Sequence, residues 1–366
     1  MSPPSASAER GGGGAGRRRT ESPRTEHPHV GYLGPEGTFT EEALLASAEP
    51  AAGVQPVALG TIYDTVAALA RGEVDWAVVP IENSLDGSVS VTLDLLATED
   101  AGMEIVGEAL LSVRHSLIAC GDVELAEIQT VLTHPQVPGQ CERFLREELG
   151  HARVLSASST AEAVRIVTAQ ARSEQVALGT RLAAEIYGGT VIRDAVQDRD
   201  DNETRFVWLA RTDQAAPADE ATRTIHGRPP LRSSGDEREG GDWKTSLVFW
   251  GAGAERSGWL VRCLSEFGRR QINLTKIESR PKRERMGSYM FFVDLQGRVD
   301  EPAVVQALAG LREICEQARV LGSYRAARTC AASAIPPPGA DAAAGDASPD
   351  RRDSPAPPLH SGAGDG

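Results

Sequence analysis

Residues 75–84 read Asp-Trp-Ala-Val-Val-Pro-Ile-Glu-Asn-Ser. A short apolar run here leads straight into polar side chains, which predicts a buried strand that ends in a polar loop. Open α/β sheets bind ligands beyond the carboxyl ends of their strands. Glu82, Asn83 and Ser84 are therefore candidate site residues. Glu82 is the most informative of them, because a carboxylate that follows a buried strand is costly to desolvate without a partner.

The same alternation of strand-like and helical stretches extends from about residue 29 to about residue 210. The strand-like runs are 30–33, 54–58, 75–80, 129–133, 152–156, 175–178 and 205–209. The helical stretches between them are 40–48, 61–70, 89–96, 138–149, 160–171 and 181–186. This order predicts an α/β fold with a mostly parallel sheet, built either as one domain or as two lobes.

A second, shorter block covers residues 243–330. It reads as a strand, a helix, two strands, a helix and a final strand, at 245–250, 258–270, 273–279, 288–295, 302–314 and 318–324. This βαββαβ order is that of a ferredoxin-like fold.

Three segments have a composition that does not favour a packed core. Residues 1–28 are rich in Gly, Ser, Pro and Arg, residues 211–242 in Pro, Gly and charged residues, and residues 331–366 in Ala, Pro, Gly and Asp. Such segments bury too little apolar surface to offset the entropy of ordering them. The sequence therefore predicts a disordered N-terminal tail, a flexible linker and a disordered C-terminal tail.

Charge and cysteine content limit the possible partners. The net charge of the 366-residue chain is -14, which argues against binding to nucleic acid or to an anionic membrane. No run approaches the roughly 20 apolar residues that span a bilayer. The five cysteines form no C-x-x-C pair, which indicates reduced thiols rather than disulfides or a zinc site. Arg17 to Arg19 precede no apolar run, so no signal peptide is expected, and we expect a cytoplasmic protein.

Three further polar segments lie at the ends of predicted strands. Gly34-Pro35-Glu36-Gly37-Thr38-Phe39-Thr40 leads into a helix, whose free N–H groups favour an anion. Thr133-His134-Pro135-Gln136 is followed by Gln140, which a helix would place on the same face as Gln136. Asn202-Glu203-Thr204-Arg205-Phe206 enters an apolar strand, and Arg205 there could clamp a carboxylate. Taken singly, each segment could also be an ordinary turn or helix cap, so the residues alone indicate only a polar cleft for a small anion.

In this order the segments resemble the prephenate dehydratase family. Its pattern of G-P-x-G-T-F, P-I-E-N-S-x-x-G, H-P-Q with a later Q-C, and N-x-T-R-F occurs at 34–39, 80–87, 134–136 with 140–141, and 202–206. The second block resembles the ACT regulatory domain through residues 272–281, Ile-Asn-Leu-Thr-Lys-Ile-Glu-Ser-Arg-Pro. At the place of the family's G-A-L element, this chain has Gly258-Trp259-Leu260.

The resemblance implies a periplasmic-binding-protein-like catalytic domain with two α/β lobes and a cleft between them. Lobe 1 would hold about 29–109 and 189–210, lobe 2 about 110–188, and the ACT domain 243–330. The implied reaction converts prephenate to phenylpyruvate without a metal or other cofactor. The resemblance also implies feedback control by L-phenylalanine and a homodimer or homotetramer.

Roles for single residues follow from the same resemblance. Thr204 would donate a hydrogen bond or proton to the departing hydroxyl, and Glu82 is the alternative proton source. Asn83, Ser84, Thr133 and Gln140 would orient the substrate, with Phe206 nearby. Backbone N–H groups at Gly37, Thr38 and Phe39, together with Arg205, would hold its carboxylates. The residues expected to bind phenylalanine are Gly258, Leu260, Asn273, Leu274, Glu278 and Ser279.

Other functions remain open at this point. The same chemistry on arogenate would give phenylalanine directly, and the sequence does not separate the two substrates. A non-catalytic receptor for a small anion could share the two-lobed architecture, because fold does not fix function. A purely regulatory amino-acid sensor would leave the four cleft segments unexplained.

Overall fold

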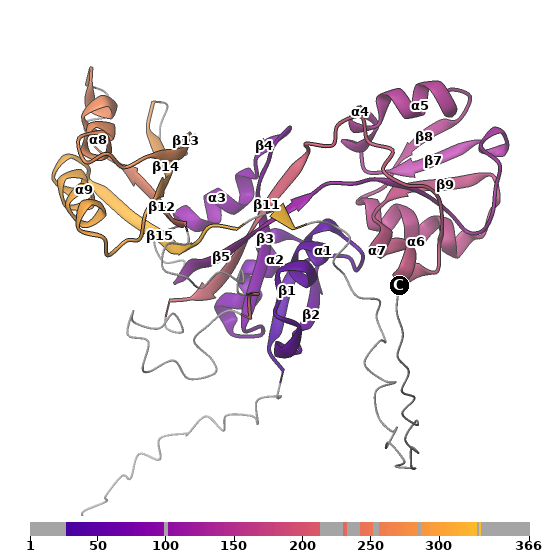
Figure 1. Cartoon of the computed structure of the whole chain (residues 1–366), viewed down its shortest axis with the longest axis horizontal. Coiled ribbons are helices and arrows are strands. Elements are labelled where there is room, and N and C mark those ends of the chain that lie inside the picture. The colour runs from indigo at the N-terminus through magenta and orange to yellow at the C-terminus, as the bar shows by residue number, and fades with distance from the viewer. Residues whose placement is uncertain are drawn as a thin grey trace, which may run out of the picture.

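The computed structural model describes residues 27–98, 102–212, 230–232, 242–251, 256–283, 287–327 and 329–330 of the 366-residue chain. They form three bodies in a row, with lobe 1 in the middle, lobe 2 on one side and the C-terminal domain on the other (Figure 1). Each body has a sheet of its own.

Lobe 1 is built on a mixed sheet of strand order β16-β5-β11-β3-β1-β2, with the short β4 beside β3. Its strands are β1 (His29–Leu33), β2 (Gln55–Leu59), β3 (Trp76–Asn83), β4 (Gly87–Ser88), β5 (Met103–Ser112), β11 (Glu203–Arg211) and β16 (Thr329–Cys330). Its helices are α1 (Phe39–Ser47), α2 (Ile62–Arg71) and α3 (Ser90–Ala97), with a 3-10 turn η1 (Pro50–Ala52). The strands β1, β2 and β3 are parallel, whereas β11 runs antiparallel to both β3 and β5.

Alternation along β11 separates the two faces of the lobe 1 sheet. Phe206 and Trp208 pack into an apolar cluster that includes residues of α1. Val207 and Leu209 pack into the cluster on the other face, with residues of α2 and α3. Successive side chains of a strand point to opposite faces, so β11 contributes to two separate cores.

Lobe 2 has a sheet of strand order β10-β6-β9-β7-β8. Its elements are β6 (Ser116–Ala119), η2 (Leu125–Glu127), β7 (Thr130–Thr133), α4 (Val137–Gln140), α5 (Glu142–Glu148), β8 (Arg153–Ser156), α6 (Thr160–Gln170), β9 (Gln175–Gly179), α7 (Arg181–Tyr187) and β10 (Thr190–Arg193). Strand β10 pairs with β6. The chain therefore returns to lobe 1 at β11, later than the expected boundary at residue 189.

Two backbone segments connect the lobes and lie side by side. The Val113 N–H donates to the Asn202 carbonyl at 2.8 Å, and the Val196 N–H donates to the His115 carbonyl at 2.9 Å. A further contact closes the lobes on one another, because the Thr180 hydroxyl, at the N-cap of α7, donates to the Gly37 carbonyl at 2.6 Å. The two lobes thus meet at the loop that precedes α1 as well as at their connections.

The C-terminal domain has the expected βαββαβ order and a sheet of order β13-β14-β12-β15. Its elements are β12 (Trp243–Trp250), α8 (Trp259–Gly268), β13 (Leu274–Pro281), β14 (Tyr289–Gln296), α9 (Pro302–Ile314) and β15 (Gln317–Arg325). Both helices lie on the side of the sheet that faces away from lobe 1 (Figure 1). The expected fold class, a two-lobed α/β domain followed by a ferredoxin-like domain, is confirmed.

The opposite face of the C-terminal sheet packs directly on lobe 1. Residues from β12, β14 and β15 join the cluster that contains Val207 and Leu209; they are Val248, Trp250, Phe292, Leu321 and Tyr324. Gly322 of β15 permits this approach, because a Cβ atom there would lie 2.0 Å from the Ile105 carbonyl oxygen of β5. Beyond β15, the chain enters the lobe 1 sheet, where β16 pairs with β5 in parallel.

Part of the predicted linker is docked rather than free. The Glu49 N–H donates to the Pro230 carbonyl at 2.7 Å, and the Arg232 N–H donates to the Ser47 carbonyl at 2.8 Å. Leu231 packs with the α1 cluster and occupies the space beside Gly107. The ends of two of these predicted segments belong to the folded domains: Arg211 is the last residue of β11, and the Gln55 N–H donates to the Pro28 carbonyl at 2.8 Å. Residues 1–26, most of the remaining linker and the C-terminal tail from 331 lie outside the described residues.

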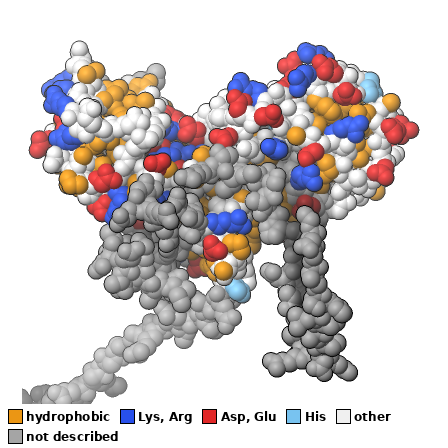
Figure 2. Space-filling view, in the orientation of Figure 1, with side chains coloured by type: hydrophobic (Ala, Val, Ile, Leu, Met, Phe, Trp, Pro, Cys, Tyr) orange, Lys and Arg blue, Asp and Glu red, His pale blue; other side chains and the backbone are white. Residues whose placement is uncertain are grey.

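The surface carries charges of both signs. Lys and Arg side chains are interspersed with Asp and Glu side chains over both ends of the molecule on the face shown in Figure 2. Among the described residues, no helix is both long enough and apolar enough to cross a bilayer.

We predict that Gly322→Ala weakens the attachment of the C-terminal domain. The added Cβ atom collides with backbone of β5 rather than with a movable side chain, so the free energy of unfolding should fall by about 1–3 kcal/mol, as for other overpacked sites. Thermal unfolding with Gly268→Ala as control measures this, because Gly268 ends α8 and has open space around it. Equal stability of the two variants would contradict the close approach of β15 to β5.

Candidate functional site

Thr204 and Asn83 face each other where β11 begins and β3 ends. The Asn83 side-chain nitrogen donates to Thr204 Oγ1 at 2.9 Å and to Asn202 Oδ1 at 2.8 Å. The Asn83 side-chain oxygen accepts from the N–H groups of Leu85 and Asp86, both at 2.9 Å. These contacts fix the orientation of the Asn83 amide, so its nitrogen points at the threonine.

This arrangement leaves the Thr204 hydroxyl as a donor. Thr204 is half-buried, and its oxygen accepts from Asn83. A hydroxyl has one hydrogen and two lone pairs, so the hydrogen of Thr204 is left to be donated to another acceptor.

A chain of side-chain contacts extends from Thr204 to lobe 2. The Asn202 nitrogen donates to Gln140 Oε1 at 3.4 Å, and the Gln140 nitrogen donates to Asp86 Oδ2 at 3.4 Å. His115 Nε2 lies 2.9 Å from the same Gln140 oxygen. Thr204 and Asn83 of lobe 1 and Gln140 of lobe 2 therefore share one polar network, although 121 residues separate Asn83 from Thr204.

His115 belongs to this network and was not among the residues predicted from the sequence. Its side chain is 1% exposed, and the Phe39 ring meets it edge-on with centroids 5.4 Å apart. Burial lowers the pKa of His115, and the hydrogen bond to Gln140 opposes that shift. The other ring nitrogen, Nδ1, is buried and has no hydrogen-bond partner in the part of the chain that the structure describes. No sequence signal marks His115, because it follows a strand as a single histidine outside the four polar segments.

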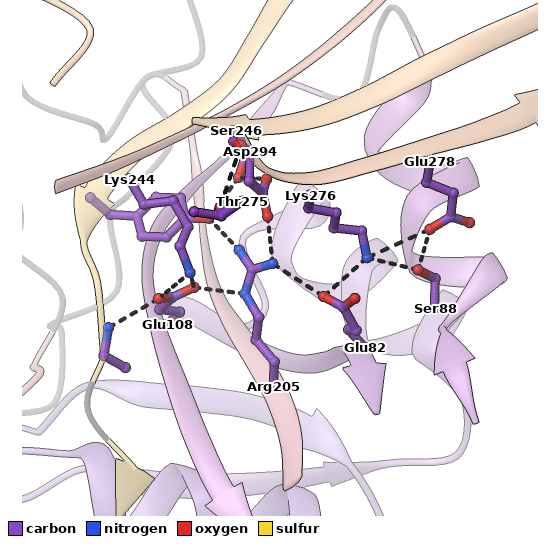
Figure 3. A network of polar contacts seen from close by, with 12 residues as sticks. Glu82, Ser88, Glu108, Arg205, Lys244, Ser246, Thr275, Lys276, Glu278 and Asp294 are labelled. Atoms are coloured by element: carbon purple, nitrogen blue, oxygen red, sulfur yellow. Dashed lines mark hydrogen bonds and ion pairs between the residues drawn. The ribbon is translucent and has the colours of Figure 1, made fainter. Parts of the chain in front are cut away.

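Glu82 and Arg205 also form a facing pair, but on the other side of the same two strands. The Glu82 carboxylate lies 3.1 Å from the Lys276 nitrogen and 3.5 Å from Arg205 Nη1 (Figure 3). Lys276 belongs to β13 of the C-terminal domain. The structure therefore brings Glu82, expected as a proton source, together with the C-terminal domain rather than with the Thr204 hydroxyl.

The guanidinium of Arg205, expected to hold a substrate carboxylate, is engaged by protein partners. Nε donates to Glu108 at 2.7 Å, Nη1 to Asp294 at 2.6 Å and Nη2 to the Tyr324 hydroxyl at 2.7 Å. Burial acts to lower the pKa of Arg205, but Tyr324, Asp294 and Glu108 raise that pKa well above its ordinary value. Arg205 is thus a permanent buried cation at the boundary with the C-terminal domain.

The loop before α1 uses some of the N–H groups that were expected to bind an anion. The Gly37 N–H donates to the Glu41 carboxylate at 2.5 Å, and Thr38 caps α1 by accepting from the Glu41 N–H at 3.4 Å. Burial raises the pKa of Glu41, while hydrogen bonds from Gly37 and Tyr32 act to lower it. The N-terminus of α1 at Phe39 remains on the side of the loop that faces His115.

Of the other residues expected to contact the substrate, one lies beside Thr204 and two are buried inside their lobes. Ser84 lies beside the site, where it accepts from the Glu203 N–H at 3.0 Å and ties the end of β3 to the start of β11. Thr133 is buried, and its hydroxyl donates to the Leu178 carbonyl at 2.9 Å. Phe206 is 1% exposed inside the α1 cluster, so its ring supports β11 from within lobe 1.

The expected effector residues lie around α8 and β13. Gly258 adopts a left-handed conformation, with φ of 79°, directly before α8, and Leu260 packs at the edge of the C-terminal core. Asn273 donates to Gln296 at 3.1 Å, and Leu274 begins β13. Ser279 is exposed, whereas Glu278 accepts a short hydrogen bond from Ser88 of lobe 1. Trp259 is 2% exposed within the core of the domain, so the chain accommodates its large ring away from the surface.

Comparison with known proteins identifies the families of the two domains. A family model described as "Prephenate dehydratase" matches residues 30–214, and a model described as "ACT domain" matches residues 254–313. A prephenate dehydratase of Amycolatopsis methanolica is 39% identical over 309 residues, covering 84% of this chain and 91% of that protein. The chain belongs to the prephenate dehydratase family.

Two solved structures of similar proteins cover most of the chain. The prephenate dehydratase of Arthrobacter aurescens in complex with L-Phe has a TM-score of 0.68 and 33% identity, over 81% of this chain and 90% of that one. GqqA, described as "a novel type of quorum quenching acylases", has a TM-score of 0.68 and 28% identity, over 82% of this chain and 98% of that one. The family predicted from the four ordered segments is thereby confirmed, as is the ACT domain.

We predict that His115 makes the stability of the protein sensitive to acid. Because its folded pKa lies below 6.5, the unfolded chain binds the proton first as the pH falls. The stabilising contribution of neutral His115 is therefore present above pH 6.5 and is lost as the pH drops through the folded pKa. Urea unfolding of His115→Gln should show a weaker loss of stability between about pH 6.5 and pH 5 than the native chain.

His134→Gln is the matched control, because that histidine lies outside the buried network. The control should keep the acid dependence of the native protein. An unchanged acid dependence in His115→Gln would show that this histidine is not the group that titrates.

Proposed function

We propose that the chain converts prephenate into phenylpyruvate, carbon dioxide and water, and that L-phenylalanine regulates this activity through the C-terminal domain. Membership of the prephenate dehydratase family supports the reaction. The observation that carries the assignment of the site is the hydrogen bond from Asn83 to Thr204, in which Thr204 is the acceptor and keeps its own hydrogen to donate.

The reaction needs little covalent chemistry from the protein. The electron pair of the breaking carbon–carboxylate bond moves into the ring, and the ring hydroxyl leaves from the opposite carbon. Aromaticity then drives the reaction forward. Hydroxide is a poor leaving group, so a proton or strong hydrogen bond must reach its oxygen, and the departing group becomes water.

Thr204 is the group we assign to the departing hydroxyl. A threonine hydroxyl is a very weak acid, so Thr204 orients and polarises the leaving oxygen or relays a proton to it. The hydrogen bond that Thr204 accepts from Asn83 supports this role, because chains of hydrogen bonds strengthen one another in a low-dielectric site. Asn202 and Ser84 hold the two strand ends together around the pair.

Fixed donors around the cleft would hold the two carboxylates of prephenate. Gln140 is one candidate, because His115 and Asn202 engage its oxygen, and its nitrogen donates one hydrogen to Asp86 and has a second hydrogen for an anion. The backbone N–H groups at the start of α1, from Thr38 to Thr40, are a second candidate, since a helix N-terminus carries partial positive charge. The engagement of Arg205 by Glu108 and Asp294 does not favour it as a direct anchor.

The C-terminal domain is the proposed site for L-phenylalanine, the ligand of the Arthrobacter aurescens structure. Strand β13 is at the edge of its sheet, and Ile277 on that strand is 49% exposed. An uncovered apolar residue on an edge strand favours side-by-side pairing of two such domains in a homodimer or homotetramer. The effector would bind near Gly258, Asn273 and Ser279 at that boundary.

A cytoplasmic location is consistent with the cysteines. The sulfur atoms of Cys263 and Cys315 lie 3.7 Å apart as free thiols. Two thiols this close together are readily oxidised outside a reducing compartment, and we propose that the cytoplasm keeps them reduced.

We predict that Thr204→Ala lowers kcat by about 10²-fold or more, the scale expected for a placed acid–base group. Thr204→Ser should retain most of the activity, because it keeps the hydroxyl that Asn83 contacts. The measurement is phenylpyruvate absorbance after mixing the pure protein with prephenate, with arogenate assayed in parallel for phenylalanine release.

Thr168→Ala is the control, since the Thr168 hydroxyl bonds only within its own helix among the residues that the structure describes. Near-native turnover in Thr204→Ala would remove Thr204 from the mechanism. A native protein that turns over neither prephenate nor arogenate would refute the proposed function itself.

We predict that the full-length protein binds L-phenylalanine with measurable heat in a titration calorimeter. Glu278→Gln is not the best probe, because Glu278 also contacts Ser88 of lobe 1. Asn273→Ala is preferable, since Asn273 bonds to Gln296 within the C-terminal domain, and it should weaken binding about tenfold, the loss expected for one polar contact. No heat with the native protein at millimolar phenylalanine would contradict the regulatory proposal.

A further inference from the structure

Two strands of lobe 1 each present one residue to the candidate site and its neighbour to the C-terminal domain. On β11, Thr204 contacts Asn83, and the next residue, Arg205, contacts Asp294 of β14. On β3, Asn83 contacts Thr204, and the preceding residue, Glu82, contacts Lys276 of β13. The residues of the candidate active site are thus one peptide unit away from residues that contact the regulatory domain.

Arg205 joins three elements at once. Its Nε bond to Glu108 lies within the lobe 1 sheet, because Glu108 belongs to β5. Its Nη1 bond to Asp294 and its Nη2 bond to Tyr324 reach β14 and β15 of the C-terminal domain. Figure 3 shows the guanidinium between Glu108 and Asp294. One rigid planar group therefore sets the distance between the two domains at this point.

The partners of Arg205 are held by further contacts. Ser246 of β12 donates to Asp294 at 2.5 Å and lies 2.6 Å from the Tyr324 hydroxyl. Lys244 of β12 donates to Glu108 at 2.7 Å. Arg205, Glu108, Asp294 and Tyr324 are 7%, 5%, 6% and 1% exposed. Because water has little access to these groups, a partner that moves away cannot be replaced cheaply by solvent.

A second connection runs through Lys276. Its nitrogen lies 3.1 Å from Glu82, donates to Ser88 at 2.7 Å and lies 3.5 Å from Glu278. Lys276 and Glu278 belong to β13, the strand expected to contribute to the effector site. Alternate residues of this strand, such as Ile277, are exposed on its other side. A ligand on the exposed side of β13 would therefore act on a strand whose other side contacts Glu82.

We propose that Arg205 is a positioning residue that couples the C-terminal domain to Thr204, with Asp294 as its partner in that domain. This inference rests on the proposed function. A displacement of Asp294 relative to Glu108 pulls on the guanidinium and shifts the backbone of β11 at Thr204. Since a ligand shifts an equilibrium only by its differential affinity for the two arrangements, phenylalanine acts on catalysis by favouring one spacing of these partners.

The first test is Asp294→Asn, which keeps the shape of the side chain but removes the charge that Arg205 contacts. Glu108 still holds Arg205 within lobe 1, so kcat without phenylalanine should stay within about threefold of the native value. The factor by which saturating phenylalanine changes kcat/KM should fall at least about fivefold, the lower end of typical coupling between sites. Calorimetry should show that phenylalanine still binds.

The matched control is Asp300→Asn, which removes an exposed carboxylate of the same domain that pairs with Arg298. It should keep the native response to phenylalanine. Tyr324→Phe is a milder second variant that removes only the hydroxyl contacted by Arg205, and it provides the same readout if Asp294→Asn does not fold.

The second test separates positioning from direct binding of the substrate. Arg205→Lys keeps a positive charge, but one ammonium group cannot replace the three directed contacts of the guanidinium. If Arg205 is a positioning residue, Arg205→Lys should lower kcat by about tenfold or more. KM should change by less than about threefold, because the substrate contacts remain. A residue that anchored a substrate carboxylate would instead raise KM and leave kcat nearly unchanged.

The outcomes distinguish this inference from the proposed function. Native turnover of prephenate with an unaltered phenylalanine response in both Asp294→Asn and Tyr324→Phe would refute the coupling and leave the enzyme assignment standing. The coupling would also be refuted if the native protein bound phenylalanine and turnover did not respond. A reduced response in the two variants, with the control unaffected, supports the role of Arg205.

Discussion

Arg205 carries a full positive charge with only 7% of its surface exposed. The protein must therefore keep carboxylates next to this group, because an unpaired charge in a low-dielectric interior costs several kcal/mol. Glu108 supplies one carboxylate from the same sheet, and Asp294 supplies the other from a separate domain. Two effects therefore hold the C-terminal domain on lobe 1. One is the burial of apolar surface, and the other is the need of Arg205 for the carboxylate of Asp294.

A bulge in β3 places the ion pairs of Arg205 directly beside the candidate active site. The pairing of β11 with β3 passes from Glu82 to Pro80, so Ile81 is the extra residue. Without the bulge, regular pairing of Ile81 with Arg205 would place Glu82 on the face of Thr204 and Asn83 on the opposite face. With it, Asn83 faces Thr204 and Glu82 faces Arg205, as the register and contacts both require. The bulge therefore decides that Asn83 lies with Thr204 in the candidate site and that Glu82 contacts Lys276 of the C-terminal domain.

Much of the architecture could be predicted from the sequence, because hydrophobic periodicity and turn residues are local properties. They indicated the α/β block, the βαββαβ domain and the polar segments around Asn83 and Thr204. The orientation of Glu82 and Arg205 could not be predicted, because it depends on the bulge at Ile81 and on the docking of a domain distant in sequence. His115 was missed for a related reason, since only the folded chain brings a single histidine next to Gln140 and Phe39.

After β15 the chain returns to lobe 1, so both ends of the C-terminal domain are attached to that lobe. The C-terminal domain begins at β12, after the segment at 230–232 that lies against α1, and it is followed by β16, which pairs with β5 inside the lobe 1 sheet. Topologically, it is an insertion between two pieces of lobe 1 rather than an appendage at the end of an enzyme. An exchange of regulatory domains between relatives would therefore need two splice points, and a graft that ended at β15 would remove a strand from the catalytic sheet.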